Sequence, residues 1–267
     1  MTARADPPLK IPARPTFISH MLSPMPIPGL LITGTDTAIG KTLVAGAIAN
    51  WFHAQGYRVA VCKPAATGCV KRREGLVSED AEFLAHCAEA CHPLDLICPQ
   101  RYAEPLAPAI AAERARQPLD WETIDRSIKL MSRDSDVMIV EGVGGLMVPM
   151  DEKHTFLDVA AWMKLPAVIV ARPSLGTINH TLLTASALRL RGVKVAGVVI
   201  NCYPTDTPGA AEETNPRAIE RWGKTHILCV VPDDPAAATT RTLTASTISA
   251  VATVDWTRFA TPPSSRR

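Results

Sequence analysis

The sequence carries almost no excess charge and no long apolar run. Its 267 residues contain 28 Lys and Arg against 26 Asp and Glu, so the formal net charge is only +2. A charge this small gives no general attraction to nucleic acid or to a membrane surface, and we expect neither as a partner. The longest apolar runs, such as Val195 to Ile200, have the length of a strand and are too short to span a bilayer.

The sequence also shows no sign of a secretory leader or of a disulfide framework. Residues 1–28 contain repeated prolines and no apolar segment of the kind that a signal peptide needs. We therefore expect a cytoplasmic protein in which residues 1–28 form a disordered extension. The seven cysteines are odd in number and scattered, which favours reduced thiols. Cys87, Cys91 and His92 lie close together, but their spacing matches no standard zinc motif and is equally typical of one helix face.

The most informative segment present is the loop GTDTAIGKT at residues 34–42, which we call the phosphate loop. An apolar run precedes it and a helix is expected after it, which argues against a chance Gly-Lys-Thr in a surface loop. Glycines let backbone amides close around phosphate, and the helix N-terminus adds positive potential. In such loops the lysine, here Lys41, meets the outer phosphates and the hydroxyl, here Thr42, meets magnesium. Five residues separate the two glycines, one more than in the standard motif, which points to a subset of these proteins.

Beyond this loop, strand and helix patterns alternate. They predict an α/β fold in which a parallel sheet is covered by helices on both faces, giving three layers. The expected strands cover residues 30–33, 58–63, 137–141, 167–171, 195–201 and 227–231. The expected helices cover residues 41–54, 78–90, 120–132, 155–163, 177–191 and 216–222. We assign residues 29–234 to this one domain and expect residues 235–267 to be partly helical or loose.

Most of the expected strands end in polar or glycine-rich residues. Ligands of an open parallel sheet bind outside the carboxyl ends of its strands, so these ends are expected to share one crevice. In chain order, the first five strands lead into the phosphate loop, Lys63, Glu141 with Gly142 to Gly144, Gly176-Thr177, and Asn201-Cys202.

Together these segments resemble the dethiobiotin synthetase family, from about Leu30 to Pro232. The resemblance is carried by GTDTAIGKT, KPAATG, EDAEFL, AEPLAPAIAAER, EGVGGLMVP and LGTINHTLLTASALRLRG. It implies a P-loop NTPase-like fold and a ligase of biotin biosynthesis that uses ATP and magnesium. In this family, diaminopelargonate and carbon dioxide are closed into dethiobiotin, and ADP and phosphate are released.

The resemblance also implies a role for each matching residue. Lys63 matches the catalytic lysine, and Thr42, Asp80 and Glu141 match the magnesium ligands. The nucleotide-binding positions are Ala38, Ile39, Gly40, Lys41, Thr42, Leu43, Glu141, Gly142, Val143, Gly144, Asn201, Cys202, Pro232, Asp233 and Asp234. The substrate-binding positions are Thr67, Gly176, Thr177 and Asn179. The last three reach the substrate carboxylate of the neighbouring subunit in this family, which implies a homodimer with the active site at its interface.

Each of these assignments has a purely structural alternative. Lys63 would otherwise be a solvated strand-end lysine, Asp80 a helix-capping carboxylate, and Thr177 a helix cap. Three positions also depart from the family's usual pattern. Ala38 replaces a frequent acidic residue, Ala109 a frequent histidine, and Cys229 a common glycine.

Two other functions share the phosphate loop. One is an amidating ligase of the cobyrinate type, but such proteins usually carry a glutamine-hydrolysing domain for which this chain has no room. The other is a partition-type ATPase switch, which often has a second lysine in the loop, whereas here Lys41 is the only one. Neither a basic stretch nor an amphipathic tail indicates a DNA or membrane partner.

Overall fold

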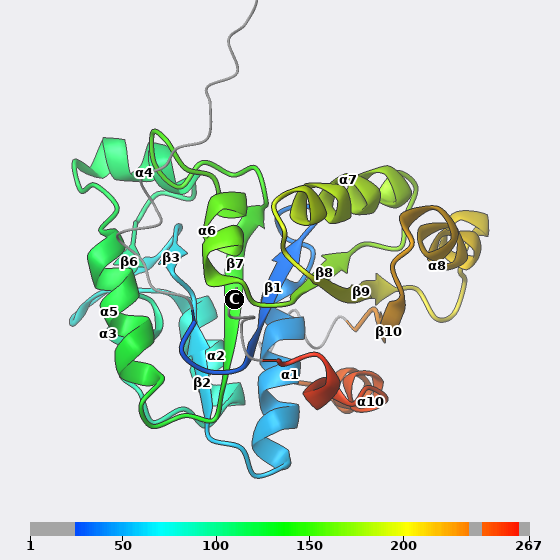
Figure 1. The fold of residues 1–267 in the computed structure, drawn as a ribbon, viewed down its shortest axis with the longest axis horizontal. Helices are drawn as coiled ribbons and strands as arrows, with labels where there is room; N and C mark the ends of the chain where they lie inside the picture. The colour runs from blue at the N-terminus through cyan, green and yellow to red at the C-terminus, as the bar shows by residue number, and fades with distance from the viewer. Residues whose placement is uncertain (1–24, 235–241, 262–267) are drawn as a thin grey trace, which may run out of the picture.

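The computed structural model describes residues 25–234 and 242–261, and a six-stranded parallel sheet forms its centre. The strand order is β10-β9-β8-β1-β7-β2, and every neighbouring pair is parallel (Figure 1). The strands are β1 (Gly29–Gly34), β2 (Val59–Cys62), β7 (Val137–Gly145), β8 (Ala167–Ala171), β9 (Val195–Tyr203) and β10 (Ile227–Pro232). All six expected strands are present, and the α/β fold is confirmed.

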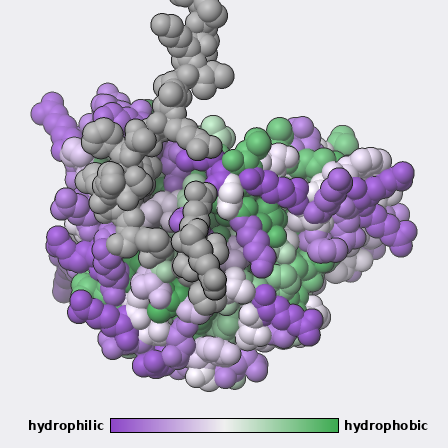
Figure 2. Space-filling view, in the orientation of Figure 1, coloured by the Kyte–Doolittle hydropathy of each residue, from purple (hydrophilic) through white to green (hydrophobic). Residues whose placement is uncertain are grey.

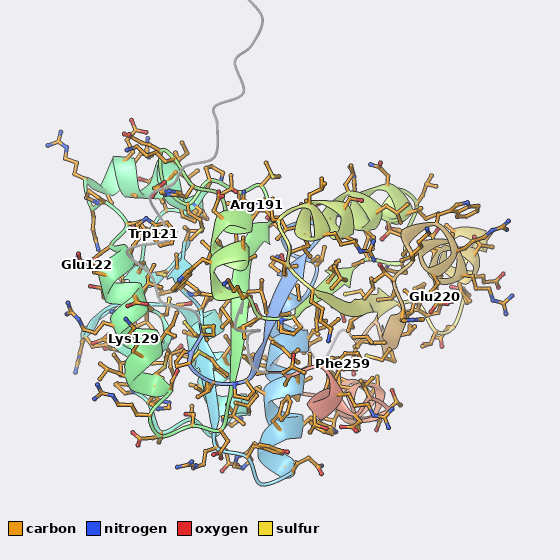
Figure 3. The ribbon with its side chains drawn as sticks, viewed as in Figure 1. Trp121, Glu122, Lys129, Arg191, Glu220 and Phe259 are labelled. Carbon is orange, nitrogen blue, oxygen red and sulfur yellow. The ribbon has the colours of Figure 1, made fainter. Side chains whose placement is uncertain are left out.

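Helices cover both faces of this sheet. One face packs against α1, α2 and α10, and the other against α6, α7 and α8. The helices are α1 (Lys41–Ala54), α2 (Glu79–Cys87), α3 (Leu94–Ile97), α4 (Pro108–Ala115), α5 (Trp121–Met131), α6 (Phe156–Met163), α7 (Thr177–Leu190), α8 (Ala210–Gly223), α10 (Ala245–Ala252) and the 3-10 helix η2 (Trp256–Arg258). Figure 3 shows Glu122 and Lys129 on the outer side of α5, whose Ile124 and Ile128 are buried.

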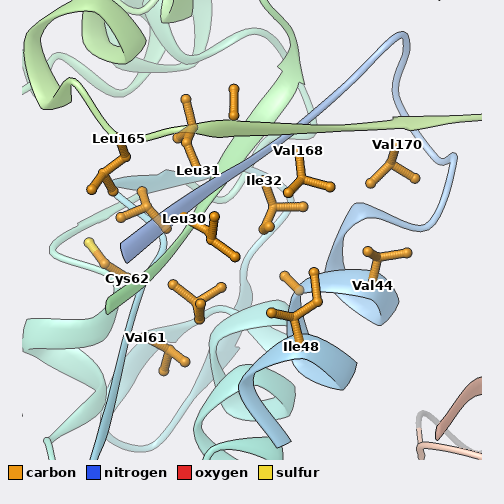
Figure 4. Packing of buried hydrophobic residues seen from close by; sticks show 14 of the residues in the cluster. Leu30, Leu31, Ile32, Val44, Ile48, Val61, Cys62, Leu165, Val168 and Val170 are labelled. Carbon is orange, nitrogen blue, oxygen red and sulfur yellow. The ribbon is translucent and has the colours of Figure 1, made fainter. Parts of the chain in front are cut away.

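The core lies around β1, the strand that leads into the phosphate loop. All six of its residues are buried, and Leu30, Leu31 and Ile32 have no exposed surface. Figure 4 shows these side chains between those of neighbouring strands and those of α1, including Val44 and Ile48. Burying each such side chain contributes about 1.5–3 kcal/mol, so the strand that delivers the loop is held on both faces.

Two small pairings were not expected from the sequence. The strands β3 (Ala65–Ala66) and β6 (Gln100–Arg101) pair in parallel, and β4 (Val70–Arg72) pairs with β5 (Gly75–Val77) in antiparallel orientation. Strands of two or three residues are too short for a periodic pattern to show. Their effect is local, because the first pair fixes the backbone immediately after Lys63.

Helix α8 is the clearest correction to the predicted boundaries. It was expected to begin at Pro216 but begins at Ala210, and the proline lies inside it. A proline at the first helical position is favourable, which is why it suggested a start. The actual start is stabilised by Glu212, whose carboxylate accepts a hydrogen bond from the Gly209 N–H at 3.1 Å. Helix α2 also differs, because it ends at Cys87 rather than at residue 90.

The chain ends bear on the expected domain boundaries. Residues 1–24, 235–241 and 262–267 lie outside the described part. Met25 is 2% exposed and belongs to the core, so packing begins four residues before the expected boundary at Gly29. Near the other end α10 packs against β10, and Trp256 is fully buried with its indole N–H donating to the Val251 carbonyl. Within residues 25–234 and 242–261, no helix combines the length and apolarity needed to cross a membrane.

Candidate active site

The sheet reverses its strand order beside β1. From this strand the chain runs first to β2 on one side, while β8, β9 and β10 follow in order on the other side. Such a switch point opens a crevice at the carboxyl ends of the strands. The phosphate loop lies there, between β1 and the first residue of α1 (Figure 1).

The backbone of the phosphate loop is closely packed against β9. Gly40 has a φ of 80°, and a Cβ atom there would lie 2.0 Å from Nδ2 of Asn201. This amide nitrogen donates a hydrogen bond to the Ile39 carbonyl at 2.9 Å. Ala38 also has a positive φ, 55°, which is unusual for a residue with a side chain. The loop is therefore held in a defined conformation by a residue 162 positions away in the sequence.

Lys41 is buried at the start of α1. Its side chain folds back along the phosphate loop, and Nζ donates a hydrogen bond to the Asp36 carbonyl at 2.7 Å. Burial lowers the pKa of this lysine, and the charge of Glu141 only partly offsets that effect. The positive charge of Lys63 lowers the same pKa further.

Lys63 lies between two carboxylates at the carboxyl end of β2. Its Nζ is 2.5 Å from Oδ2 of Asp80, in the first turn of α2, and 2.9 Å from Oε1 of Glu141, in β7. Burial alone would lower the pKa of Lys63, but the charges and hydrogen bonds of Glu141 and Asp80 outweigh it and raise the pKa above 10.5. The side chain is 6% exposed, so this is a buried, charged lysine rather than a solvated one.

Glu141 joins this cluster to the phosphate loop. Its Oε1 accepts a hydrogen bond from the Thr42 hydroxyl at 2.7 Å as well as the one from Lys63. Its Oε2 is buried and has no hydrogen-bond partner among the described residues. Four segments that are distant in the sequence thus meet at one point, through Thr42, Lys63, Asp80 and Glu141.

The oxygen atoms of this cluster fit a magnesium ion. A hydroxyl and two carboxylates, one with an unsatisfied buried oxygen, are the ligand types that this cation prefers, and it usually retains waters and binds substrate phosphates as well. In the described part of the chain, no group of three or more His, Cys, Asp or Glu side chains is arranged to hold a metal. Any ion here would therefore depend on phosphate and water for its remaining ligands.

The expected substrate positions lie near the same edge of the sheet. Thr67 is half-buried in the segment that follows Lys63. The backbone N–H groups of Gly68 and Cys69 hold this segment in place by donating hydrogen bonds to the carbonyls of Glu104 and Tyr102. Around the start of α7, Gly176 and Asn179 are exposed, while Thr177 is buried and its hydroxyl has no partner within the described residues.

The last five of the expected nucleotide-binding positions lie at the ends of β9 and β10. Asn201 is 1% exposed and Cys202 has a φ of 55°. Pro232 pairs with Tyr203, whose carbonyl accepts a hydrogen bond from the Asp233 N–H at 2.8 Å. The carbonyl oxygen of the Asn201 side chain is buried without a hydrogen-bond partner in the described ranges.

One contact at this edge was missed in the sequence. Arg172, directly after β8, forms an ion pair through Nη2 with Oδ2 of Asp36 in the phosphate loop. Neither residue was assigned a role. The available signal was the position of Arg172 at the end of a buried strand, but sequence spacing alone does not show which loop such a side chain reaches.

The fold and this cluster define a phosphate-loop nucleotide-binding protein. A family model described as an AAA domain matches residues 28–241. The ATP-dependent dethiobiotin synthetase of Thermodesulfovibrio yellowstonii is 37% identical over 211 residues, which cover 76% of this chain and 88% of that protein. The corresponding enzyme of Bacillus cereus is 38% identical over 206 residues, covering 76% and 83%. The chain belongs to the ATP-dependent dethiobiotin synthetase family.

The MinC:MinD cell division protein complex of Aquifex aeolicus gives a TM-score of 0.48 at 14% identity, over 83% of this chain and 86% of the matched chain.

Proposed function

We propose that this chain uses ATP to close diaminopelargonate and carbon dioxide into dethiobiotin, with release of ADP and phosphate. The observation that carries the proposal is the position of Lys63, buried against Glu141, which is itself bonded to Thr42 of the phosphate loop. A charged lysine is thereby fixed beside the expected triphosphate. Membership of the family favours this reaction over an amidating ligase of the cobyrinate type and over a partition-type switch.

The reaction proceeds through a carbamate. One amine of the substrate takes up carbon dioxide and loses a proton, and a carbamate oxygen then attacks the γ-phosphorus of ATP while ADP leaves. The second amine attacks the carbonyl carbon of the resulting mixed anhydride and loses a proton, phosphate leaves, and the ring is closed. The carbamate and the triphosphate are both anions, so the site must offset their repulsion and hold them in line.

Lys63 and Lys41 supply fixed positive charge for this step. We assign Lys63 to the carbamate and the transferring phosphoryl group, and Lys41 to the outer phosphates. Correct positioning contributes roughly 7–11 kcal/mol to lowering such barriers. Each charge-assisted hydrogen bond contributes about 1.5–3 kcal/mol. Both lysines are buried, so their positive charges are in place before the substrates bind.

Thr42, Asp80 and Glu141 are proposed to hold magnesium. When bound there, the ion supplies positive charge that screens the phosphate oxygens from the carbamate. The buried Oε2 of Glu141, which lacks a hydrogen-bond partner among the described residues, supports this assignment. In this structure the Lys63 ammonium group neutralises both carboxylates, which would also hold the metal.

The remaining nucleotide contacts are proposed from the phosphate loop and three strand ends. In the loop, Ala38, Ile39, Gly40 and Leu43 surround the phosphates together with Lys41 and Thr42. At the carboxyl end of β7, Gly142, Val143 and Gly144 present backbone to the same region. Asn201, Cys202, Pro232, Asp233 and Asp234 line the base. The unsatisfied Oδ1 of Asn201 supports a base that donates from an exocyclic amino group, as adenine does.

The substrate site is proposed to be completed by a second subunit. Thr67 follows Lys63 in the same segment of the chain, while Gly176, Thr177 and Asn179 would contact the carboxylate of the substrate bound to the neighbour. Leu175 and Leu183 are 89% and 62% exposed at and near the start of α7, and Figure 2 shows apolar surface in this region. Apolar side chains beside a proposed shared site favour a homodimer.

The experiment that tests the function is a phosphate-release assay. The purified protein is mixed with ATP, magnesium, bicarbonate and diaminopelargonate, and we expect phosphate release that depends on the diamine. Dethiobiotin is then identified by mass spectrometry. Absence of phosphate release with this diamine, together with turnover of another acid, would show that the proposed substrate is wrong.

A further inference from the structure

Arg172 occupies a specific place relative to the phosphate loop. It directly follows β8, which pairs with β1 so that Val170 lies opposite Gly34, the first loop residue. The Thr35 N–H donates to the Val170 carbonyl at 3.0 Å, which extends this pairing into the loop. The backbone of Arg172 is thus fixed beside the loop by the sheet itself.

The guanidinium group of Arg172 is anchored by Asp36. Its Nη2 binds Oδ2 of this aspartate, whose other oxygen accepts the Thr37 N–H at 2.7 Å. The side chains of Arg172 and Asp36 are 39% and 50% exposed. An ion pair this exposed contributes little to folding stability. Its effect is to orient the guanidinium group of Arg172 beside the phosphate loop.

Asp36 also links Arg172 to Lys41. The carbonyl of Asp36 accepts the Lys41 Nζ hydrogen bond at 2.7 Å, so both cations are bound to the same loop residue. A lysine at this position of a phosphate loop reaches the β- and γ-phosphates. Arg172 is therefore at the end of the loop where the outermost phosphate is expected.

Among the described residues, few other cations of the site are available to bind the outermost phosphate. Lys63 is engaged by Asp80 and Glu141, and Lys41 is the only lysine in the phosphate loop. A guanidinium group has five N–H donors in a planar fork that suits phosphate oxygens. The contact with Asp36 uses Nη2, and Nε of Arg172 is buried with no partner in the part of the chain that is described.

We propose that Arg172 is a triphosphate-binding residue that contacts the γ-phosphate of ATP, with Asp36 as the positioning residue that orients its guanidinium group. This inference rests on the nucleotide-binding role proposed above for the phosphate loop. Arg172 belongs to the same chain as the loop, so it supplies an arginine in cis, as other phosphoryl-transfer enzymes do.

The test compares binding of ATP and ADP, with magnesium and without the diamine, by isothermal titration calorimetry. In Arg172→Ala we expect ATP to bind about tenfold or more weakly, because a charge-assisted hydrogen bond to the γ-phosphate is lost. ADP affinity is expected to fall less than about threefold, since ADP has no γ-phosphate. Arg172→Lys retains a charge but not the fork, so it should lie between Arg172→Ala and the unaltered protein.

Two further variants separate direct contact from a structural effect. Asp36→Ala keeps the guanidinium group and is expected to weaken ATP binding less than Arg172→Ala does. Arg58→Ala is the control, because Arg58 also forms an exposed ion pair, with Asp136, but at the amino end of β2, and its loss should leave both affinities unchanged. Thermal unfolding verifies that each variant is folded. Arg172→Gln replaces Arg172→Ala if the alanine variant does not fold, with the same expected result.

The proposal is overturned if the Arg172 variants bind ATP as the unaltered protein does. It is equally overturned if ATP and ADP are weakened by the same factor, or if Asp36→Ala matches Arg172→Ala, because Arg172 would then act only through the loop. None of these titrations contains diaminopelargonate. The comparison of ATP and ADP affinities would therefore still test the role of Arg172 if the ring-closure assay failed.

Discussion

At the scale of single residues, the proposed chemistry depends on a lysine that is buried and still charged. Lys63 avoids the cost of burial because Asp80 and Glu141 lie on either side of its ammonium group. The same contacts orient the group toward the phosphate loop, which a solvated lysine with free rotamers does not achieve. Stability and function at this position therefore have the same physical origin.

We expect Lys63→Ala to reduce turnover by at least about 100-fold, because the charge that stabilises the carbamate and the phosphoryl group is lost. ATP affinity should be largely retained, since Lys41 and the loop amides remain. Phosphate release and calorimetry measure the two effects separately. Lys129→Ala is the control, because Lys129 lies on the outer side of α5 and pairs with Asp125 (Figure 3). Retained turnover in Lys63→Ala would show that its assigned role is wrong.

Asn201 leads to a prediction about the nucleobase. Its Nδ2 already donates to the Ile39 carbonyl, which leaves the buried Oδ1 as the group that meets the base. Because Oδ1 is an acceptor, the base must present a donor to it. Adenine offers an amino group at position 6, whereas guanine offers a carbonyl oxygen that would leave Oδ1 unpaired. We expect kcat/KM for ATP to exceed that for GTP by about tenfold or more. Equal values for the two nucleotides in the phosphate-release assay would contradict this assignment.

Site residues that belong to motifs could be predicted from the sequence. Contacts that depend on the direction of a long side chain could not. Thr42, Asp80 and Glu141 were grouped from the family resemblance, and the structure brings them together around Lys63. The ion pair between Arg172 and Asp36 was not predicted, because neither spacing nor composition shows that an arginine 136 positions away reaches the loop. To predict contacts of this kind, one must know the register between β1 and β8.

At the scale of helices and strands, an ion pair connects the two helices that cover the sheet above β7 and β8. Asp158 in α6 is 9% exposed, and its Oδ1 lies 2.7 Å from Nη2 of Arg191, which follows α7 (Figure 3). Burial would raise the pKa of Asp158, but the backbone hydrogen bond from Thr155 and the contact with Arg191 lower it below 3.8. The carboxylate is thus kept charged at neutral pH.

We expect Arg191→Ala to lower the free energy of unfolding by about 1–2 kcal/mol at pH 7, because Asp158 keeps its bonds to Thr155 but loses its cation. Because the folded pKa of Asp158 is depressed, its stabilisation is present above about pH 3.8 and is lost as the pH falls through the folded value. The effect of the substitution should therefore shrink at pH 3. Urea titrations at the two pH values measure it, and an effect that does not depend on pH would exclude this explanation.

The helix boundaries show where sequence patterns are sufficient. Helix α1 was predicted to its observed bounds because a glycine loop precedes it and its apolar residues are buried against the sheet. Helix α8 was predicted too short because Pro216 was interpreted as its first residue, whereas tertiary packing tolerates a proline inside it. Local propensity gave the wrong start because the backbone donor that Pro216 lacks costs less than exposing Asn215, which is buried and donates a hydrogen bond to the Pro173 carbonyl.

At the scale of the whole molecule, the proposed site is complete only in a dimer. Leu183 lies one helical turn after Asn179, on the same face of α7, and is 62% exposed. We expect Leu183→Glu to shift the protein toward monomers and to reduce turnover, as measured by sedimentation velocity and phosphate release. Trp222 in α8 has the same exposed fraction, so Trp222→Glu is the control and should leave the dimer intact. A monomeric unaltered protein with full activity would exclude the shared site.

Subunit mixing tests whether Lys63 and Asn179 of different chains serve one site. If they do, Lys63→Ala and Asn179→Ala dimers are each inactive, because every site lacks one of the two residues. In a mixed dimer, one site combines both substitutions and the other combines neither, so that second site is intact. Random exchange makes half of the dimers mixed, and each mixed dimer has one working site of two. We therefore expect recovery of about a quarter of the original activity after the two variants are unfolded and refolded together. If both residues serve a site within one chain, every mixed dimer has two defective sites and no activity returns.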